Sequence, residues 1–325
     1  MRWPDQPVTI QVPATSANLG PGFDSLGLAL GLHDTVRARV LPSGLEVNVT
    51  GVGADSVERG EGHLVIRAMR AAFAAIGAEP PGIAISCGNE VPQGFGLGSS
   101  AAAIVSGVLA ARALAGTAGA AALGDDAVLQ LATELEGHPD NVAACLLGGL
   151  TVSWASGASF RGPWRDRGTR PPAASPVQAA RLTPLPDLVL VLCVPAVPLS
   201  THTARKALPA QVPHADAAAN SARAALLVAA LTSRPDLLLA GTEDFLHQSY
   251  RAAAMPATAA LITRLRDAGV AAVVSGAGPS VLALTVSGMQ PGPAEVTKIA
   301  AAADPVWRVM PLGVDADGAV LVGGP

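Results

Sequence analysis

The chain has 325 residues, of which 50% are hydrophobic and 14% are charged, and its formal net charge is −4 at pH 7. This length and composition predict a compact globular protein with two domains and exclude a disordered chain. The lack of basic clusters argues against a nucleic-acid-binding surface. The sequence contains no run of about 20 uninterrupted apolar residues, the length that a membrane-spanning helix needs.

Alternating apolar and polar residues predict strands, and apolar residues three and four positions apart predict helices. In the first half of the chain the patterns predict strands at residues 8–12, 35–41, 45–50, 83–87 and 150–154. They predict helices at residues 64–76, 101–115 and 125–135. Residues 157–186 contain prolines, glycines and five arginines with little periodicity, and we interpret them as an exposed connection. An anion-binding arginine cluster is the alternative, but no regular element would aim those side chains.

The second half begins with a strongly apolar strand at 188–194 and continues with strands at 270–275, 281–286 and 307–312. Helices are predicted at 215–231, 258–268 and 295–303. Mixed strands and helices in both halves predict an α+β protein with two layered domains. We divide the chain into an N-terminal domain at 1–156, a connecting segment at 157–186 and a C-terminal domain at 187–325.

A glycine-rich turn at 92–102 leads into a predicted helix. Its glycines allow backbone N–H groups to approach a ligand, and Ser99 and Ser100 stand where the helix begins, so the segment suits a nucleotide phosphate. No lysine completes a Walker A loop, and Ser99 stands where a dinucleotide fingerprint needs its third glycine. A tight turn before a core helix is the alternative. The predicted nucleotide-binding residues are Pro92, Gln93, Gly94, Phe95, Gly96, Leu97, Gly98, Ser99, Ser100, Ala101 and Ala102.

The close approach of backbone to phosphate also predicts the effect of a side chain in this turn. We expect valine at Gly96 or Gly98 to abolish nucleotide binding while leaving the fold largely intact.

Three further polar clusters have the chemistry of a binding site. In the loop at 13–24, Asp24 could hold an ammonium group and Asn18 a hydroxyl, although an Asx-rich turn that caps its own backbone is equally compatible. In the segment 134–141, Glu134 or Glu136 could hold Mg²⁺, which takes one or two carboxylates together with phosphate oxygens. His138 alone would more often be a structural histidine.

The last cluster supplies cations. If residues 201–205 are helical, Thr201 and Arg205 share a face, and Arg205 could bind a carboxylate through two hydrogen bonds. Arg251 is a second candidate for that role. Either arginine could equally be a surface charge.

Together these motifs resemble the GHMP small-molecule kinases over residues 8–312. Three of them occur in the family's order: Pro-x-x-Ser-Ala-Asn-Leu-Gly-x-Gly-Phe-Asp at 13–24, Gly-Leu-Gly-Ser-Ser-Ala-Ala at 96–102 and Ser-Gly-x-Gly-Pro-Ser at 275–280. The first motif and Glu-Gly-His-Pro-Asp-Asn at 136–141 are most similar to the homoserine kinases of that family.

The resemblance implies an N-terminal domain like the second domain of ribosomal protein S5 and a ferredoxin-like C-terminal domain. It implies phosphorylation of the side-chain hydroxyl of L-homoserine by ATP, a step of threonine biosynthesis, with ATP along the 92–102 loop. Ser99 and Glu136 would place Mg²⁺, with Glu134 as the alternative because the metal glutamate of mevalonate kinases precedes the histidine by four. The implied homoserine contacts are Asn18, Asp24, His138, Asn141, Thr201, Arg205 and Arg251.

The predicted catalytic residues are Ser99, Glu136, Asp140 and Asn141. Some relatives have an aspartate base where this chain has Asn141, and an amide cannot take a proton. Asp140 is adjacent, but neighbouring residues seldom point the same way. We therefore expect catalysis mainly by positioning and charge neutralisation, which phosphoryl transfer tolerates. A kinase for another small alcohol and an inactive metabolite-binding regulator on the same fold are the alternatives.

The three cysteines, Cys87, Cys145 and Cys193, are far apart and lack metal-site spacing. This usage suits three core thiols in a reducing cytoplasm better than disulfides or zinc. Residues 1–12 lack the apolar segment of a signal peptide. We expect a cytoplasmic enzyme with a small-molecule substrate and no nucleic-acid or membrane partner, and the resemblance implies a possible homodimer.

Overall fold

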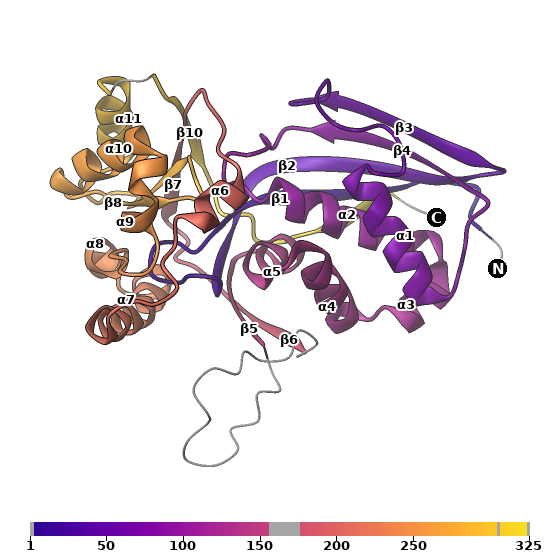
Figure 1. The fold of residues 1–325 in the computed structure, drawn as a ribbon, viewed down its shortest axis with the longest axis horizontal. Coiled ribbons are helices and arrows are strands. Elements are labelled where there is room, and N and C mark those ends of the chain that lie inside the picture. The colour runs from indigo at the N-terminus through magenta and orange to yellow at the C-terminus, as the bar shows by residue number, and fades with distance from the viewer. Residues whose placement is uncertain (1–2, 156–175, 304–305, 324–325) are drawn as a thin grey trace, which may run out of the picture.

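A computed structural model describes residues 3–155, 176–303 and 306–323. Within these ranges the chain forms two sheets (Figure 1). The first has seven strands in the order β11-β1-β2-β4-β3, with β5 paired to β2 and β6 paired to β5. Its strands are β1 (Val8–Ala17), β2 (Leu26–Leu41), β3 (Gly44–Gly51), β4 (Gly82–Asn89), β5 (Leu150–Ala155), β6 (Val177–Leu182) and β11 (Val320–Gly323).

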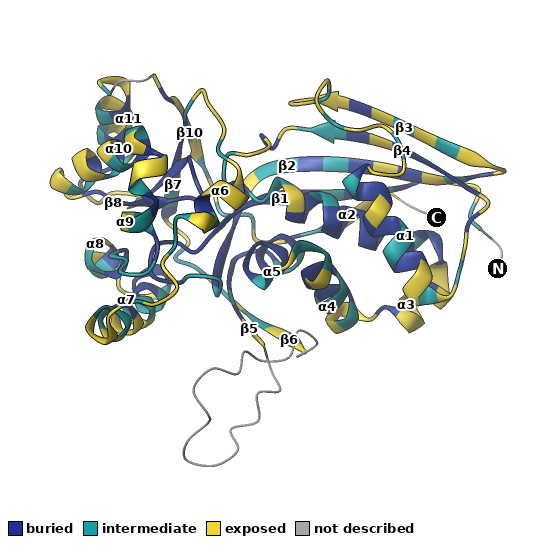
Figure 2. Cartoon of the chain, viewed as in Figure 1, coloured by how far each residue is buried: buried dark blue, intermediate teal, exposed yellow. Residues whose placement is uncertain are grey.

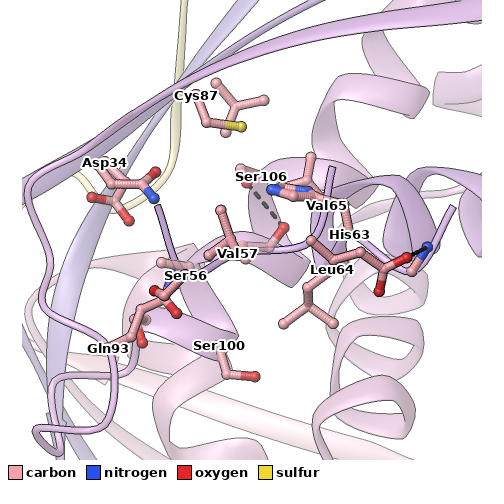
Figure 3. Close-up of a pocket in the computed structure, with 17 residues that line it drawn as sticks. Asp34, Ser56, Val57, His63, Leu64, Val65, Cys87, Gln93, Ser100 and Ser106 are labelled. Atoms are coloured by element: carbon pink, nitrogen blue, oxygen red, sulfur yellow. Dashed lines mark hydrogen bonds between the residues drawn. The ribbon is translucent and has the colours of Figure 1, made fainter. Parts of the chain in front are cut away.

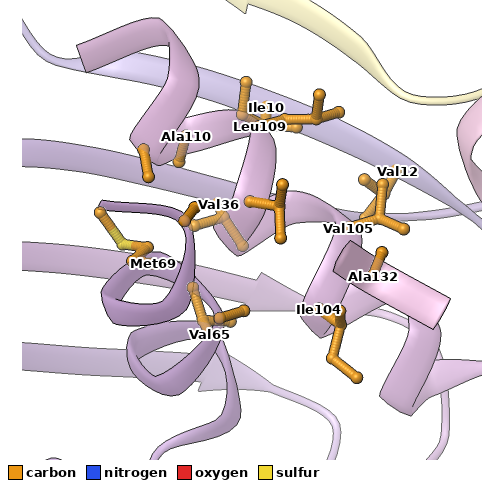
Figure 4. Close-up of a cluster of buried hydrophobic side chains, with 14 of the residues drawn as sticks. Ile10, Val12, Val36, Val65, Met69, Ile104, Val105, Leu109, Ala110 and Ala132 are labelled. Carbon is orange, nitrogen blue, oxygen red and sulfur yellow. The ribbon is translucent and has the colours of Figure 1, made fainter. Parts of the chain in front are cut away.

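Five helices gather on one face of this sheet, with α3 packed against α1 and α2 rather than against the strands (Figure 1). They are α1 (Leu64–Ile76), α2 (Ser99–Leu114), α3 (Gly116–Ala122), α4 (Asp125–Glu136) and α5 (Pro139–Leu147). Helix α2 is buried over most of its length because its side chains are small. At Gly107 an added Cβ would lie 2.6 Å from Val65 O of α1, so the two helices approach closely. Figure 4 shows the resulting core, in which Val105 and Leu109 of α2 meet Ile10 and Val12 of β1.

The second sheet has four antiparallel strands in the order β10-β7-β9-β8. They are β7 (Leu188–Val194), β8 (Ala271–Val274), β9 (Val281–Val286) and β10 (Arg308–Leu312). Helices α6 (Thr201–Lys206), α7 (His214–Thr232), α8 (Leu238–Gly241), α9 (Gln248–Arg251), α10 (Pro256–Asp267) and α11 (Pro293–Ala301) complete this half, with 3₁₀ turns at Pro235–Leu237 and Ala252–Ala254.

Strand β7 explains the strongly apolar run seen in the sequence. Leu190 and Leu192 pack into a core that α7 also joins, whereas Val191 and Cys193 pack against α10 and α11. Both faces of the strand are therefore covered, and it lies dark blue in the middle of the second half in Figure 2. The expected α+β architecture with strands and helices in both halves is confirmed.

Several elements differ from the sequence-based expectation. Strand β1 continues to Ala17 past an irregularity between Pro13 and Ala14, so residues 13–17 are strand rather than loop. Strand β2 begins at Leu26, well before the predicted start at residue 35. The pattern missed this part because the first five residues of the strand are all buried, so their burial does not alternate. The patterns also miss α3, α5, β6 and β11, which are short.

Sheet pairing crosses the proposed domain limits in two places. Strand β6, within the predicted connecting segment, pairs with β5, and β11 at the end of the chain pairs with β1. The division at 157–186 stays a prediction. Of the five arginines of that segment, Arg181 lies exposed in β6 and donates to Ala316 O, and the other four lie outside the described residues.

All three cysteines are free and buried, which confirms the expected core thiols. Among the helices of the described ranges, none is long and apolar enough to cross a membrane.

Candidate active site

The glycine loop, the 136–141 segment, two arginines and the second glycine turn meet around one cavity between the two halves of the chain. Fifteen residues line it: Asn18, Gly94, Gly96, Leu97, Gly98, Ser99, Ser100, Glu136, His138, Asp140, Asn141, Arg205, Arg251, Gly276 and Ala277. Residues that are far apart in the sequence, and that the motifs single out separately, are thus brought together.

The glycine loop has the backbone that an anion site needs. Gly94, Gly96 and Gly98 have φ angles of 78°, 73° and 68°, the left-handed region that glycine favours. Gly98 is the N-cap of α2 and supplies no side-chain cap. Within the described ranges, the N–H groups of Gly96, Gly98 and Ser99 donate no hydrogen bond to protein. The helix N-terminus is therefore open to phosphate oxygens, and the residues present fit ATP.

The expectation that valine at Gly96 or Gly98 leaves the fold intact is wrong. A Cβ at Gly96 would overlap Ser275 O, and a Cβ at Gly98 would overlap the Thr15 hydroxyl. These glycines are required because other parts of the protein pack against the loop. A larger residue would displace the loop itself rather than only fill the space for phosphate.

Hydrogen bonds connect the three glycine-containing motifs. Ser275 Oγ donates to Gly96 O at 2.7 Å and lies 2.9 Å from Ser16 Oγ, from which it can accept. Asn18 Nδ2 donates to Gly276 O at 2.8 Å, and Gly276 N donates to Ala17 O at 3.1 Å. The second glycine turn therefore fixes both the β1–β2 loop and the phosphate loop.

The 136–141 segment presents an ordered set of polar groups. Asp140 is 2% exposed, and its Oδ1 accepts from His138 Nδ1 at 2.7 Å and from Asn141 N at 2.8 Å. Thr15 Oγ1 donates to Asn141 Oδ1 at 2.8 Å. Burial disfavours the charged imidazole of His138, but the hydrogen bond to Asp140 and the nearby carboxylates outweigh it and raise the pKa of His138.

The structure separates the two glutamates proposed for Mg²⁺. Glu136 lines the cavity, and Ser100 Oγ donates to its Oε2 at 2.7 Å. Burial raises the pKa of Glu136. Glu134 is exposed and instead accepts from Gln130 Nε2. Among the described residues, no three His, Cys, Asp or Glu side chains gather to hold a metal by themselves. A single carboxylate with the Ser99 hydroxyl fits Mg²⁺, because this ion takes its remaining ligands from phosphates and water.

Asp24 and Asn18 have different partners from those the sequence suggests. Asp24 forms an ion pair with Arg205, and Asn18 Oδ1 accepts from Asp24 N at 3.0 Å. Both have positive φ, 67° for Asn18 and 53° for Asp24, so the loop holds them in a specific conformation. The structure places Asp24 beside Arg205 rather than at a separate subsite.

Arg251 differs from Arg205 in being 1% exposed. Its Nε donates to Ala204 O, and its Nη1 lies 3.1 Å from His247 Nδ1 and 3.3 Å from Gly276 O. Within the described ranges, no carboxylate lies within 4 Å of this guanidinium. Burial, followed by the charge of Arg205, lowers the pKa of Arg251. A buried cation with no anionic partner, on the wall of a cavity, suits an anionic ligand group.

Sequence reasoning missed three residues that support the site. His247 is fully buried and its Nε2 donates to Gly20 O at 2.8 Å, which holds its Nδ1 as an acceptor for Arg251. Phe23 lies under both guanidinium groups, with its ring centroid 5.6 Å from Arg251 Cζ and 6.0 Å from Arg205 Cζ. Thr15 orients Asn141. Phe23 and Thr15 both lie within the motif at 13–24, but the sequence analysis assigned roles only to the polar residues Asn18 and Asp24 of that motif.

Thr201 is the first residue of α6, which confirms the helix on which its expected role depends, but its side chain lies outside the described part of the structure. Phe95 and Leu97 point into the core, so the loop would use their backbone rather than their side chains. Pro92 and Ala101 are also buried.

A second, larger cavity of about 300 Å³ adjoins the first, and Ser99 and Ser100 line both. Its wall combines apolar side chains of β2, α1 and α2 with the polar residues shown in Figure 3. Gln93 and Ala102 of the predicted nucleotide-binding set lie here. A cavity of this size beside an open helix N-terminus suits the base and sugar of a nucleotide.

Comparison with known proteins identifies the family. Residues 63–149 match the GHMP kinases N terminal domain, and residues 222–304 match the GHMP kinases C terminal domain. The chain is 51% identical to a homoserine kinase of Streptomyces coelicolor over 97% of this chain and 94% of that protein. It is 48% identical to a homoserine kinase of Clavibacter michiganensis over 97% of this chain and 93% of that protein.

Solved structures agree. The crystal structure of homoserine kinase from Cytophaga hutchinsonii superimposes with a TM-score of 0.80 at 26% identity and covers 99% of both chains. A putative homoserine kinase from Listeria monocytogenes gives 0.72 at 27% identity, covering 98% of this chain and all of that one. This chain therefore belongs to the GHMP kinase family.

Proposed function

We propose that this chain transfers the terminal phosphoryl group of ATP to the side-chain hydroxyl of L-homoserine, giving O-phospho-L-homoserine and ADP. The observation that carries the substrate is Arg251, a buried guanidinium without a carboxylate partner in the described residues. It lines the same cavity as the open N-terminus of α2. This arrangement supports a phosphate site with a site for an amino-acid carboxylate beside it.

The chain's own residues would bind the amino acid by charge. Arg251 and Arg205 would hold its carboxylate, and Asp24 would hold its ammonium group. Burial removes the hydration of both charges, so the site must compensate by pairing each of them. Asn141, fixed by Thr15, would hold the hydroxyl near the phosphate loop. His138, oriented by Asp140, would line the same pocket. Thr201 would add a contact from the start of α6.

The loop and the glutamate would place the nucleotide. The residues 92–102 would bind ATP through backbone N–H groups, and Ser99 and Glu136 would hold Mg²⁺. When bound, ATP supplies the phosphoryl group and Mg²⁺ neutralises its charge. The backbone N–H groups at the start of α2 would donate to that group and stabilise the charge that develops on it.

The Asp140 carboxylate orients two neighbouring groups of the cavity wall through one of its oxygens. Asp140 Oδ1 already accepts from His138 and from the Asn141 backbone. We therefore propose that the residues act by positioning and charge neutralisation, with the hydroxyl proton passing to the phosphate.

A coupled assay of ADP release tests the proposal. Homoserine, threonine, mevalonate, shikimate and galactose are each supplied with ATP and Mg²⁺. Turnover of homoserine far above the others is the expected result. Turnover of another alcohol would assign a different GHMP kinase, and ADP release with none of them would favour an inactive metabolite-binding regulator. A cytoplasmic location stays a prediction from the cysteine usage, and a homodimer stays a prediction of the resemblance.

A further inference from the structure

The protein itself occupies three of the five N–H groups of the Arg251 guanidinium. Its Nε donates to Ala204 O at 3.2 Å, and its Nη1 donates to Gly276 O at 3.3 Å and to His247 Nδ1 at 3.1 Å. Nη2 has no hydrogen-bond partner in the described ranges, and it is not one of the enclosed side-chain atoms that lack a partner. Nη2 therefore stays open to a carboxylate in the cavity that Arg251 lines.

His247 is the one side chain among these three partners, and its contacts allow only one arrangement of protons on the ring. Nε2 lies 2.8 Å from the Gly20 carbonyl, which can only accept, so Nε2 carries a proton. Nδ1 lies 3.1 Å from Arg251 Nη1, which can only donate, so Nδ1 keeps its lone pair. Both contacts select the same neutral tautomer. A second proton would place an N–H of a charged ring against the guanidinium.

The ring is enclosed between the two halves of the chain. His247 is fully buried, and Phe23 packs against it with ring centroids 5.3 Å apart. Gly20 and Phe23 belong to the loop between β1 and β2, whereas His247 and Arg251 are the N-cap and the last residue of α9. His247 thereby joins the loop that carries Asp24 to the helix that carries Arg251.

Three charged groups act on this ring. Asp244, which precedes α9, places its Oδ2 3.6 Å from His247 Nε2, and Asp24 and Arg251 act from the loop and from α9. Burial is the largest effect, and with the charge of Arg251 it outweighs the two carboxylates and lowers the pKa of His247. The ring is therefore neutral at pH 7 and gains its second proton only in acid.

We propose that His247 is a positioning residue for homoserine binding: its neutral Nε2–H tautomer holds Arg251 with Nη2 facing the substrate carboxylate, and a second proton on the ring breaks this arrangement. The proposal rests on the proposed function, because Arg251 must contact the substrate. Homoserine should bind more weakly as the ring gains its second proton. The ammonium and carboxylate groups of homoserine both stay charged between pH 5 and 7, so they do not contribute to this change.

Two substitutions separate the two contacts of the ring. His247→Asn places an amide oxygen at the level of Nδ1, where it accepts from Arg251, but loses the bond to Gly20. His247→Gln places an amide N–H at the level of Nε2, where it donates to Gly20 O, but loses the acceptor for Arg251. Calorimetry at pH 7.5 should show homoserine bound about tenfold more weakly by His247→Gln, the effect of one hydrogen bond to a charged group, and within about threefold of the wild type by His247→Asn.

The same pair of variants separates positioning from a structural role. Each loses one of two buried hydrogen bonds, so a structural role alone would lower the Tm and the homoserine affinity alike in both. ADP should bind both variants as it binds the wild type. His214→Asn changes an exposed histidine of α7 and should bind homoserine and ADP normally. Equal homoserine affinities of His247→Asn and His247→Gln would overturn the proposal.

The pH dependence of binding tests the second proton. Between pH 7 and 5 the homoserine affinity of the wild type should fall more than that of His247→Asn. His138, which lines the same cavity and has a raised pKa, is present in both proteins, so the difference between the two curves reports His247. Parallel curves would contradict the proposed effect of the proton.

The tautomer is read by ¹⁵N spectra of histidine-labelled protein, with the His247 signals identified by their loss in His247→Asn. We expect a protonated Nε2 and an unprotonated Nδ1 at pH 7.5, and the opposite tautomer would overturn the proposal. A wild-type protein that binds ADP but not homoserine would show instead that the proposed substrate is wrong, and the role of His247 with it.

Discussion

Asp24 and Arg205, 181 positions apart, form an ion pair through two hydrogen bonds, 2.9 Å for Nη2–Oδ1 and 3.3 Å for Nη1–Oδ2. Their side chains are 37% and 38% exposed. A pair this exposed contributes about 1 kcal/mol or less to stability. Separating the two groups beside the cavity therefore costs little free energy. The ammonium group of a zwitterion could then pair with Asp24 while its carboxylate pairs with Arg205.

The difference in burial between the two arginines predicts different effects on homoserine binding. Arg251→Leu should weaken homoserine binding by about 2–5 kcal/mol, as expected for loss of one partner of a buried charge pair. Arg205→Leu should weaken it less, because that side chain is partly exposed and leaves Asp24 in place. Calorimetry with homoserine and with ADP measures both, and ADP binding should change little. Should neither variant affect homoserine, the amino-acid substrate would be wrong.

The sequence predicted the site better than the details of its geometry. Motifs at 13–24, 96–102, 136–141 and 275–280 mark the residues that line the cavity, because each needs glycine or a polar group at fixed spacing. The partner of each side chain could not be predicted. Asp24 faces Arg205 because segments from the two halves of the chain pack together. For the same reason, a Cβ added at Gly96 would meet Ser275 O. In the same way β2 was misjudged where it is buried on both faces and the alternating pattern disappears.

Glycine substitutions should act on the fold as well as on binding. Gly77 has a φ of 72° and nothing within 4 Å of an added Cβ, so Gly77→Ala adds only left-handed strain, about 1–2 kcal/mol. Gly96→Ala adds the same strain and an overlap with Ser275 O. We expect Gly96→Ala to lower the free energy of unfolding clearly more than Gly77→Ala, as measured by urea titration. Equal losses would mean that the loop moves aside freely.

A carboxylate base can be excluded or identified with Asp140→Asn. Because Asp140 orients His138 and the Asn141 backbone, the variant should bind homoserine more weakly but retain measurable turnover at saturation. A loss of ~10⁴-fold in kcat with unchanged homoserine affinity would instead identify general-base catalysis, since this is the upper range for such a group.

Three histidines predict how stability depends on pH. Burial lowers the pKa of His63 and, with the nearby charge of Arg251, that of His247 below the ordinary 6.5. The unfolded chain then binds more protons at these two sites, so the free energy of unfolding falls as the pH drops below 6.5, by at most about 1.4 kcal/mol per pH unit for each. His138 has a raised pKa and opposes them: its contribution is present below 6.5 and is lost as the pH rises through the folded value.

Urea titrations between pH 5 and 8 check these signs. His63→Leu should lose less stability than the wild type as the pH falls, because it removes one of the two histidines whose lowered pKa makes the folded protein less stable at low pH. His138→Asn should lose more. The reverse order would contradict the assigned directions.

Glu136 and Glu134 offer a test variant and a matched control for the metal site. Glu136→Gln should raise the Mg²⁺ concentration needed for half-maximal activity by about tenfold or more, the loss of one charged ligand interaction, whereas the exposed Glu134→Gln should behave as the wild type. Because burial raises the pKa of Glu136, protons compete with Mg²⁺ at a higher pH than at an ordinary glutamate. The Mg²⁺ requirement of the wild type should therefore rise as the pH falls, and that of Glu136→Gln should depend less on pH. An impaired Glu134→Gln with a normal Glu136→Gln would assign the metal to the other carboxylate.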